Sequence, residues 1–113
     1  MMKQITAIIR PEKYEAVRAA IEKCGCPGIM ISDIEGHGKQ KGIEQVWRGE
    51  KFRMELIPKI KIQIVVSSSE VEKIVQEIVR AAKTGNVGDG KIFISTVDEA
   101  IRIRTGERGD QAI

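Results

Sequence analysis

The stretch KIKIQIVVSSSEVE, Lys59–Glu72, decides the fold, because it joins a strand pattern directly to the start of a helix. Every second residue over 59–66 is apolar, which predicts a strand with one apolar face formed by Ile60, Ile62, Ile64 and Val66. Ser69 and Glu72 stand three residues apart and predict a capping box at the helix start. The apolar residues that follow recur at helical spacing and predict a buried stripe: Val71, Ile74, Val75, Ile78, Val79 and Ala82.

The first half of the chain repeats this order of elements. Alternation predicts a strand over 3–10, and a second strand is expected over 28–36. Pro11 predicts the start of the helix between them, because a missing N–H costs least there. This helix would bury a stripe and end at a glycine and a proline: Tyr14, Val17, Ile21 and Cys24, then Gly25 and Pro27. A last strand is predicted over 91–97.

The order β-α-β, a long insertion, then β-α-β predicts an α+β fold, the ferredoxin-like βαββαβ sandwich with both helices on one face of the sheet. The opposite face would carry Ile8, Val65 and Phe93. These apolar side chains need cover, so we expect a homo-oligomer that packs the sheet faces together.

The composition fits one domain, residues 1–113, with 42% apolar residues, 31% charged residues and a net charge of +3. No apolar run has membrane-spanning length and the start lacks signal-peptide features, so a soluble intracellular protein is expected. Cys24 and Cys26 form a single C-x-C pair, and His37 is the only histidine. Two ordinary reduced thiols are therefore favoured over a zinc site.

The insertion, 36–58, is far longer than the turn that joins adjacent antiparallel strands. It mixes apolar residues, Trp47, Phe52, Leu56 and Ile57, with six Lys and Arg up to Lys59. Passive linkers lack aromatic residues, so this composition favours a partner-binding loop over simple disorder.

The segment TGNVGDGKIFI, 84–94, has the P-loop spacing from Gly85 to Gly90 and Lys91, but Ile92 stands where the metal-binding Ser or Thr belongs. A strand is predicted after it instead of a helix, so NTP hydrolysis by the P-loop mechanism is excluded. A surface turn and an anion cradle remain open. IRIRTGE, 101–107, supplies two arginines suited to a polyphosphate, and GHGKQKG, 36–42, is either a second anion site or a hinge.

Together, TGNVGDGKIFI, GHGKQKG, LIPKIKI and IRIRTGE resemble, in order and spacing, the PII nitrogen-regulatory signal-transduction proteins. The resemblance runs from AIIRPEK to the terminal QAI. It implies a cytoplasmic homotrimer of ferredoxin-like subunits that is not an enzyme. It also implies a T-loop at about 37–57 that docks onto targets, and a C-terminal segment at about 98–113.

The resemblance implies ATP or ADP in clefts between neighbouring subunits, with Arg102 and Arg104 supplied by the neighbour. The other implied nucleotide-binding residues are Ile8, Gly28, Ile29, Met30, Gly36, His37, Gly38, Lys39, Gln40, Gln63, Val65, Gly88, Asp89, Gly90, Lys91 and Phe93. The second implied ligand is 2-oxoglutarate, bound through Mg²⁺ that ATP and Gln40 share. Lys59 would pair with its distal carboxylate, and Lys41, Gly42 and Gly88 would line the pocket.

The implied targets are an ammonium transporter or enzymes of nitrogen metabolism, contacted through Arg48 and Phe52. The chain departs from the family pattern at WRGEKF, 47–52, where Phe52 replaces a modifiable tyrosine and Glu50 replaces a phosphorylated serine. Lys39 stands where arginine is common, and Met30 where a hydroxyl residue is common. Ligands alone would then set the state of the protein.

A ferredoxin-like RNA-binding module is the alternative. It would need aromatic residues on the two central strands, expected over 3–10 and 59–66, and these contain none. The chain also lacks a Ser–His–Asp or Cys–His arrangement. We therefore expect neither nucleic-acid binding, nor membrane insertion, nor enzymatic activity.

Overall fold

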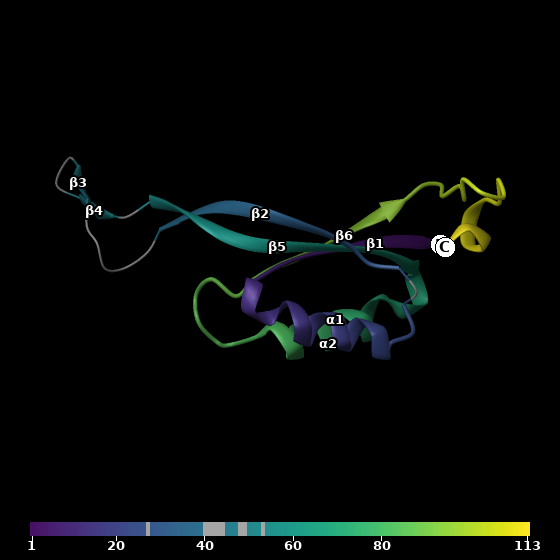
Figure 1. Cartoon of the computed structure of the whole chain (residues 1–113), viewed down its shortest axis with the longest axis horizontal. Coiled ribbons are helices and arrows are strands. Elements are labelled where there is room, and N and C mark those ends of the chain that lie inside the picture. The colour runs from purple at the N-terminus through teal and green to yellow at the C-terminus, as the bar shows by residue number, and fades with distance from the viewer. Residues whose placement is uncertain (27, 40–44, 48–49, 53) are drawn as a thin grey trace.

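The computed structural model describes residues 1–26, 28–39, 45–47, 50–52 and 54–113, with side chains described outside 36–56. The four long strands are β1 (Met2–Ile9), β2 (Met30–Lys39), β5 (Met54–Ser67) and β6 (Gly90–Val97). They form one antiparallel sheet in the order β2-β5-β1-β6. The helices α1 (Tyr14–Lys23) and α2 (Val71–Ala82) cover one face of this sheet (Figure 1). The predicted ferredoxin-like α+β fold is confirmed, and β1 and β5 are its central strands.

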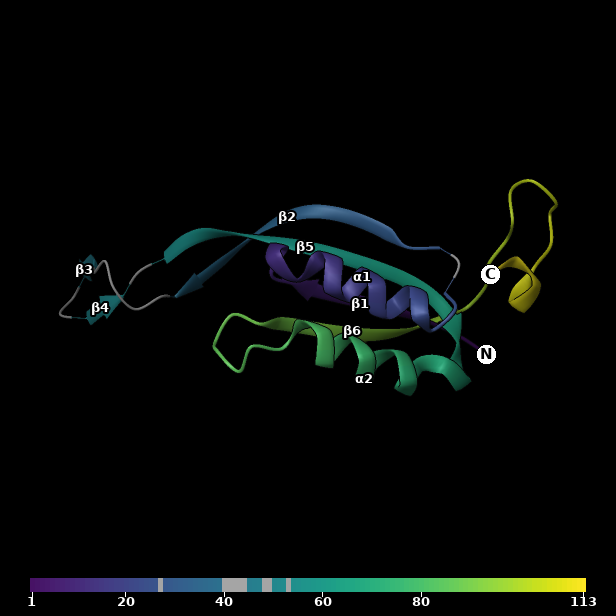
Figure 2. The same cartoon turned by 60° about the horizontal axis from the view of Figure 1, so that its bottom comes forward.

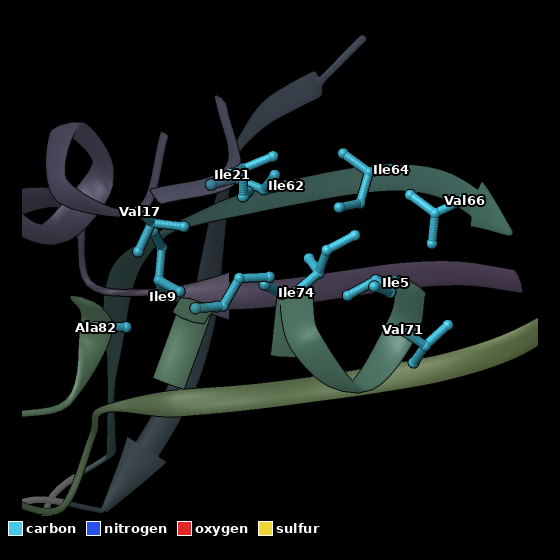
Figure 3. Packing of buried hydrophobic residues seen from close by; sticks show 12 residues of the cluster. Ile5, Ile9, Val17, Ile21, Ile62, Ile64, Val66, Val71, Ile74 and Ala82 are labelled. Atoms are coloured by element: carbon cyan, nitrogen blue, oxygen red, sulfur yellow. The ribbon is translucent and has the colours of Figure 1, made fainter. Parts of the chain in front are cut away.

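The core lies between this sheet and the two helices (Figure 3). The two central strands and both helices contribute side chains that are at most 2% exposed: Ile5, Ala7 and Ile9 from β1, Ile62 and Ile64 from β5, Val17 and Ile21 from α1, and Ile74 and Ile78 from α2. Burying one such branched side chain contributes about 1.5–3 kcal/mol, so these residues dominate the stability of the chain. The apolar face predicted over 59–66 is confirmed.

The helical stripes are confirmed with one correction. Val71, Ile74, Ile78 and Ala82 are buried, but Val79 is 46% exposed. Because β6 is the last strand of the sheet, α2 has no strand to cover beyond it. Val79 instead lines a mostly apolar cavity of ≈ 270 Å³ with Val75 and Ile92, beside the edge of the sheet.

The predicted capping box is wrong. Ser69 lies inside a 3-10 turn, Ser68–Glu70, which precedes α2, so the chain has already turned before the predicted cap position. Ser67 occupies the N-cap of that turn with extended backbone, and neither N-cap makes a side-chain hydrogen bond. Pro11, in contrast, opens a 3-10 turn that leads into α1, as predicted.

The strands run further into the insertion than predicted. β2 and β5 remain paired from Gly36 with Ile57 to Lys39 with Met54, so they form a two-stranded ribbon beyond the helices (Figure 2). Pro58 is tolerated because β1 pairs with β5 only as far as Ile60, which leaves one side of β5 free at this point. A short hairpin, β3 (Gln45–Trp47) with β4 (Glu50–Phe52), lies further along.

The sheet face opposite the helices carries Ile8, Val65 and Phe93, as predicted. Phe93 is 57% exposed, and Met30, on the same face, is 54% exposed. The register places Thr6 of β1 opposite both Gln63 and Phe93. This open face is therefore apolar in part and available to another molecule. Neither helix of the described residues reaches the length and apolar character that crossing a membrane requires.

Candidate functional site

The loop at 84–90, which joins α2 to β6, is folded around the carboxylate of Asp89. One carboxylate oxygen accepts hydrogen bonds from the backbone N–H groups of Thr84 (2.8 Å) and Gly85 (2.9 Å). The other accepts from the hydroxyl of Thr84 and from Nε of Arg10 (3.0 Å). Side-chain contacts therefore set the shape of this loop. A simple surface turn between a helix and a strand would not need such contacts.

These contacts also fix the charge of the loop. The hydroxyl and N–H of Thr84, followed by the N–H of Gly85 and by Arg10, hold the pKa of the Asp89 carboxyl well below its ordinary value. The Arg10 guanidinium donates a second hydrogen bond, from Nη2 to the carbonyl of Val87, at 3.0 Å. The negative charge of Asp89 thus lies against Arg10 and does not oppose an anion at the loop.

Gly90 lies where no other residue fits. Its φ is +109°, and a Cβ built on it would lie 1.8 Å from the carbonyl oxygen of Ile8. Gly88, at φ +103°, places its Cα beside the Arg10 guanidinium. Positive φ at alternate positions turns successive backbone N–H groups in a way suited to anions, and Lys91 follows directly.

Lys59 of β5 reaches the loop from the other side and donates a hydrogen bond to the carbonyl of Gly88. On the open sheet face, Ile8 lies between Lys61 of β5 and Lys91 of β6 in the strand register. We call Ile8, Lys59, Gly88, Gly90 and Lys91 the loop half-site. It combines cations, exposed amides and an apolar side chain, the groups needed by an anion that carries a flat apolar part.

The predicted arginines do not join the loop half-site in one chain. β6 spans 8 residues, so its ends lie about 23 Å apart, with the loop at one end and the C-terminal segment past the other. Figures 1 and 2 both show this segment at the end of the sheet opposite the loop. Arg102 forms an ion pair with Glu107 at 3.0 Å, and a bridge between Ile101 and Arg108 closes this small hairpin.

Other predicted residues lie toward the same end as the arginines. Met30 begins β2 and pairs with Gln63 of β5, and Gly28 and Ile29 directly precede β2. We call the second group, Met30, Gln63, Val65, Arg102 and Arg104, the arginine half-site. Phe93 of β6 is in register with Thr6 and Gln63, and so lies level with the sheet residues of the arginine half-site.

Several predicted residues are not tested by this geometry. Gln40, Lys41, Gly42 and Arg48 lie outside the described residues. For Gly36, His37, Gly38, Lys39 and Phe52 the structure describes the backbone alone, within β2 and β4. Within the described part of the chain, no cluster of three or more His, Cys, Asp or Glu could hold a metal ion.

The sequence interpretation missed Arg10 and assigned Asp89 to the nucleotide. A signal for both existed, because a carboxylate inside an anion-binding loop requires a compensating cation. Locally, however, Arg10 only precedes the helix start at Pro11 and belongs to no motif.

Comparisons with known proteins show which family the chain resembles in sequence and in fold. The family model described as nitrogen regulatory protein P-II matches residues 2–107. The chain is 53% identical over 112 residues to nitrogen regulatory protein P-II 2 of Methanothermobacter thermautotrophicus, covering 99% of this chain and 97% of that protein. It superposes on the GlnK–ATP complex of B. subtilis with a TM-score of 0.85 and 35% identity, covering 99% and 97% of the two chains.

Arabidopsis thaliana PII bound to citrate is similar too, with a TM-score of 0.81 and 36% identity, covering 99% of this chain and 92% of that one. The family model spans most of the chain, and the relative from M. thermautotrophicus is aligned along almost its whole length. The chain belongs to the P-II family of nitrogen regulatory proteins, which are signalling regulators and not enzymes.

Proposed function

We propose that the protein is a cytoplasmic homotrimer that binds ATP or ADP between neighbouring subunits and 2-oxoglutarate with Mg²⁺ beside the nucleotide. The observation that carries this proposal is the loop at 84–90, with Gly88 and Gly90 at positive φ beside Lys59 and Lys91. The related GlnK was solved with ATP, and the related PII with citrate, a carboxylate ligand.

The separation of the two half-sites supports a site between subunits. A loop and an arginine pair about 23 Å apart cannot grip one triphosphate within a single chain. A neighbour that brings its arginine half-site to the loop half-site would complete the polyanion site. Packing of subunits would also cover Phe93 and Met30 on the open sheet face, together with Ile103, which is 99% exposed.

In this proposal Arg102 changes its partner from the carboxylate of Glu107 to a phosphate of the nucleotide. Its guanidinium is bonded to Glu107, so a phosphate must share or replace that carboxylate. Arg104 lies two residues further along, in the turn of the same small hairpin, and would add a second cation. Both arginines suit the forked geometry that phosphate oxygens accept.

For the second ligand, Lys59 would pair with the distal carboxylate of 2-oxoglutarate, while Gln40, Lys41, Gly42 and Gly88 line its pocket. Gln40 would hold Mg²⁺ together with ATP, and the 2-oxo and carboxylate oxygens of 2-oxoglutarate, hard ligands of the kind Mg²⁺ prefers, would chelate it. In this structure Lys59 donates to the carbonyl of Gly88, so its ammonium already lies beside the loop.

The output would be the segment at about 37–57, whose conformation depends on the bound ligand and which docks onto an ammonium transporter or an enzyme of nitrogen metabolism. Arg48 and Phe52 are the proposed contact residues. The mechanism is a population shift, in which ATP with Mg²⁺ and 2-oxoglutarate favours one state of the segment and ADP another.

Isothermal titration calorimetry tests the ligand proposal. ATP is titrated first, and then 2-oxoglutarate with and without ATP and Mg²⁺. We expect 2-oxoglutarate to bind only in their presence; equal binding without nucleotide would refute the coupled sites. Lys59→Ala should abolish 2-oxoglutarate binding and leave ADP binding largely unchanged. Lys73→Ala, on the exposed side of α2, is the matched control and should change neither.

The RNA-binding alternative is not supported. β1 and β5 are the central strands, and neither carries an aromatic residue over Met2–Ile9 or Lys59–Ser67. Salt-dependent retention on immobilised RNA, measured beside ATP binding, would reveal such an activity.

A further inference from the structure

We propose that Arg10 and Asp89 form a positioning pair, which holds the glycine loop in the shape that binds phosphate without either side chain touching the nucleotide. This inference rests on the proposed function and deepens it. The resemblance placed Asp89 among the nucleotide-binding residues, and this proposal assigns its side chain to the loop.

Asp89 has no room for a ligand. An ionised carboxylate offers about four lone-pair positions. In this structure Arg10, the hydroxyl and N–H of Thr84, and the N–H of Gly85 fill them. Its side chain is only 24% exposed, and a bare carboxylate beside phosphate would be repelled. Asp89 therefore acts on the loop, by drawing the end of α2 toward the start of β6.

Arg10 connects this loop to the centre of the sheet. Ile9, the residue before it, pairs with both Ile60 of β5 and Gly90 of β6. The Arg10 backbone is thus fixed by strands on both sides. From this position its guanidinium bonds Asp89 and the carbonyl of Val87, both at 3.0 Å.

The two hydrogen bonds of Arg10 enclose the peptide groups on either side of Gly88. The Val87 carbonyl is bonded directly, and Asp89 follows Gly88 in the chain. A Cβ on Gly88 would lie 3.3 Å from Nη2 of Arg10, so the guanidinium packs closely against this residue. Arg10 therefore holds the Val87–Gly88 peptide directly and the far side of Gly88 through the Asp89 side chain before any ligand arrives, which reduces the ordering that binding requires.

If Arg10 and Asp89 position the loop, replacing Arg10 should weaken the binding of a nucleotide more when it carries more phosphates. Arg10→Gln removes the positive charge and the forked guanidinium, so the loop loses its hydrogen bonds from residue 10 to Asp89 and to the carbonyl of Val87. ATP affinity should fall by roughly tenfold, the effect of losing charge-assisted hydrogen bonds that preorganise a site. AMP, which reaches less of the loop, should lose less than twofold. Arg10→Lys keeps the charge with a single-point donor and should recover part of the ATP affinity.

The test is calorimetric titration of ATP, ADP and AMP into the full-length trimer of each variant. A ratio of ATP to AMP affinity that falls in Arg10→Gln and partly recovers in Arg10→Lys supports the pair. Loss of affinity that is equal for the three nucleotides would overturn it. Arg18→Gln is the matched control, because Arg18 makes comparable ion pairs with Glu15 and Glu22 on the exposed surface of α1.

Thr84→Val provides a second test if Arg10→Gln does not fold. It removes the hydroxyl bond to Asp89 and keeps the N–H bond, so a smaller fall in the same ratio is expected. An unchanged ratio in Thr84→Val and Arg10→Lys would refute the positioning role while leaving nucleotide binding intact. If the wild-type protein binds none of the nucleotides, the proposed function and the positioning role are both overturned.

Discussion

Replacing Gly90 with alanine should destabilise the fold more than a glycine-to-alanine substitution anywhere else in the loop. The new Cβ would lie 1.8 Å from the carbonyl oxygen of Ile8, a contact that requires the start of β6 to move away from β1. The positive φ adds about 1–3 kcal/mol of strain. Weakening one or two ladder hydrogen bonds adds about 1 kcal/mol each. We therefore expect a loss of about 2–5 kcal/mol, a large part of the total stability of a small domain.

The measurement is urea unfolding followed by far-UV circular dichroism at a fixed protein concentration. Gly85→Ala is the matched control, because Gly85 has a φ of +91° and an added Cβ there would have no other atom within 4 Å. It should lose only the strain of positive φ, about 1–3 kcal/mol, and so about 1–2 kcal/mol less than Gly90→Ala, which also weakens ladder hydrogen bonds. If both variants lost the same free energy, the close approach of Gly90 to Ile8 would not be the cause and the reasoning would be refuted.

Two further predictions concern the loop charge and the core. The Asp89 pKa is lowered by folding, so its carboxylate stabilises the fold above the unfolded-state pKa of about 3.9, and this contribution is lost as pH falls through the folded pKa. The difference in urea midpoint between wild type and Asp89→Asn should thus stay constant from pH 7 to about pH 5 and shrink below about pH 4; shrinkage above pH 6 would contradict this. Ile64→Ala, at 1% exposure, should cost about 2–5 kcal/mol in the same assay. Val87→Ala, at 97% exposure, should change the stability by less than about 0.5 kcal/mol, and equal losses would argue against the assigned core.

The strands and helices of the body follow from short-range patterns, which is why the sequence predicts them well. Ile62, Ile64 and Val66 alternate and are buried as expected, since period-2 alternation depends only on which face meets the helices. The ribbon beyond Gly36 could not be predicted in this way. Glycines without side chains give no alternation, and the pairing of Lys39 with Met54 depends on backbone register alone.

The capping error has a similar cause. Three consecutive serines offer two equal spacings, Ser67 to Glu70 and Ser69 to Glu72, and the pattern does not choose between them. The chain enters its 3-10 turn at Ser68 without either bond. Local rules thus located the helix but not its first turn.

The site was predicted where its residues are neighbours in sequence. Gly88, Gly90 and Lys91 stand in one motif, and the structure places them with Lys59. Arg10 was missed because its partners Val87 and Asp89 lie 77 and 79 residues away, and only the sheet order brings them together.

The central place of β1 also sets the order in which the molecule can assemble during translation. β1 is made first, yet both of its neighbours, β5 and β6, are made after the middle of the chain. The β2–β5 ribbon has far more local pairings and can form sooner. The central strand β1 therefore has no paired neighbour until most of the polypeptide has left the ribosome. Until then the apolar side chains of Ile5 and Ile9 are not covered by the complete core. During that interval a nascent chain depends on chaperones, or on rapid release, to avoid association through this strand.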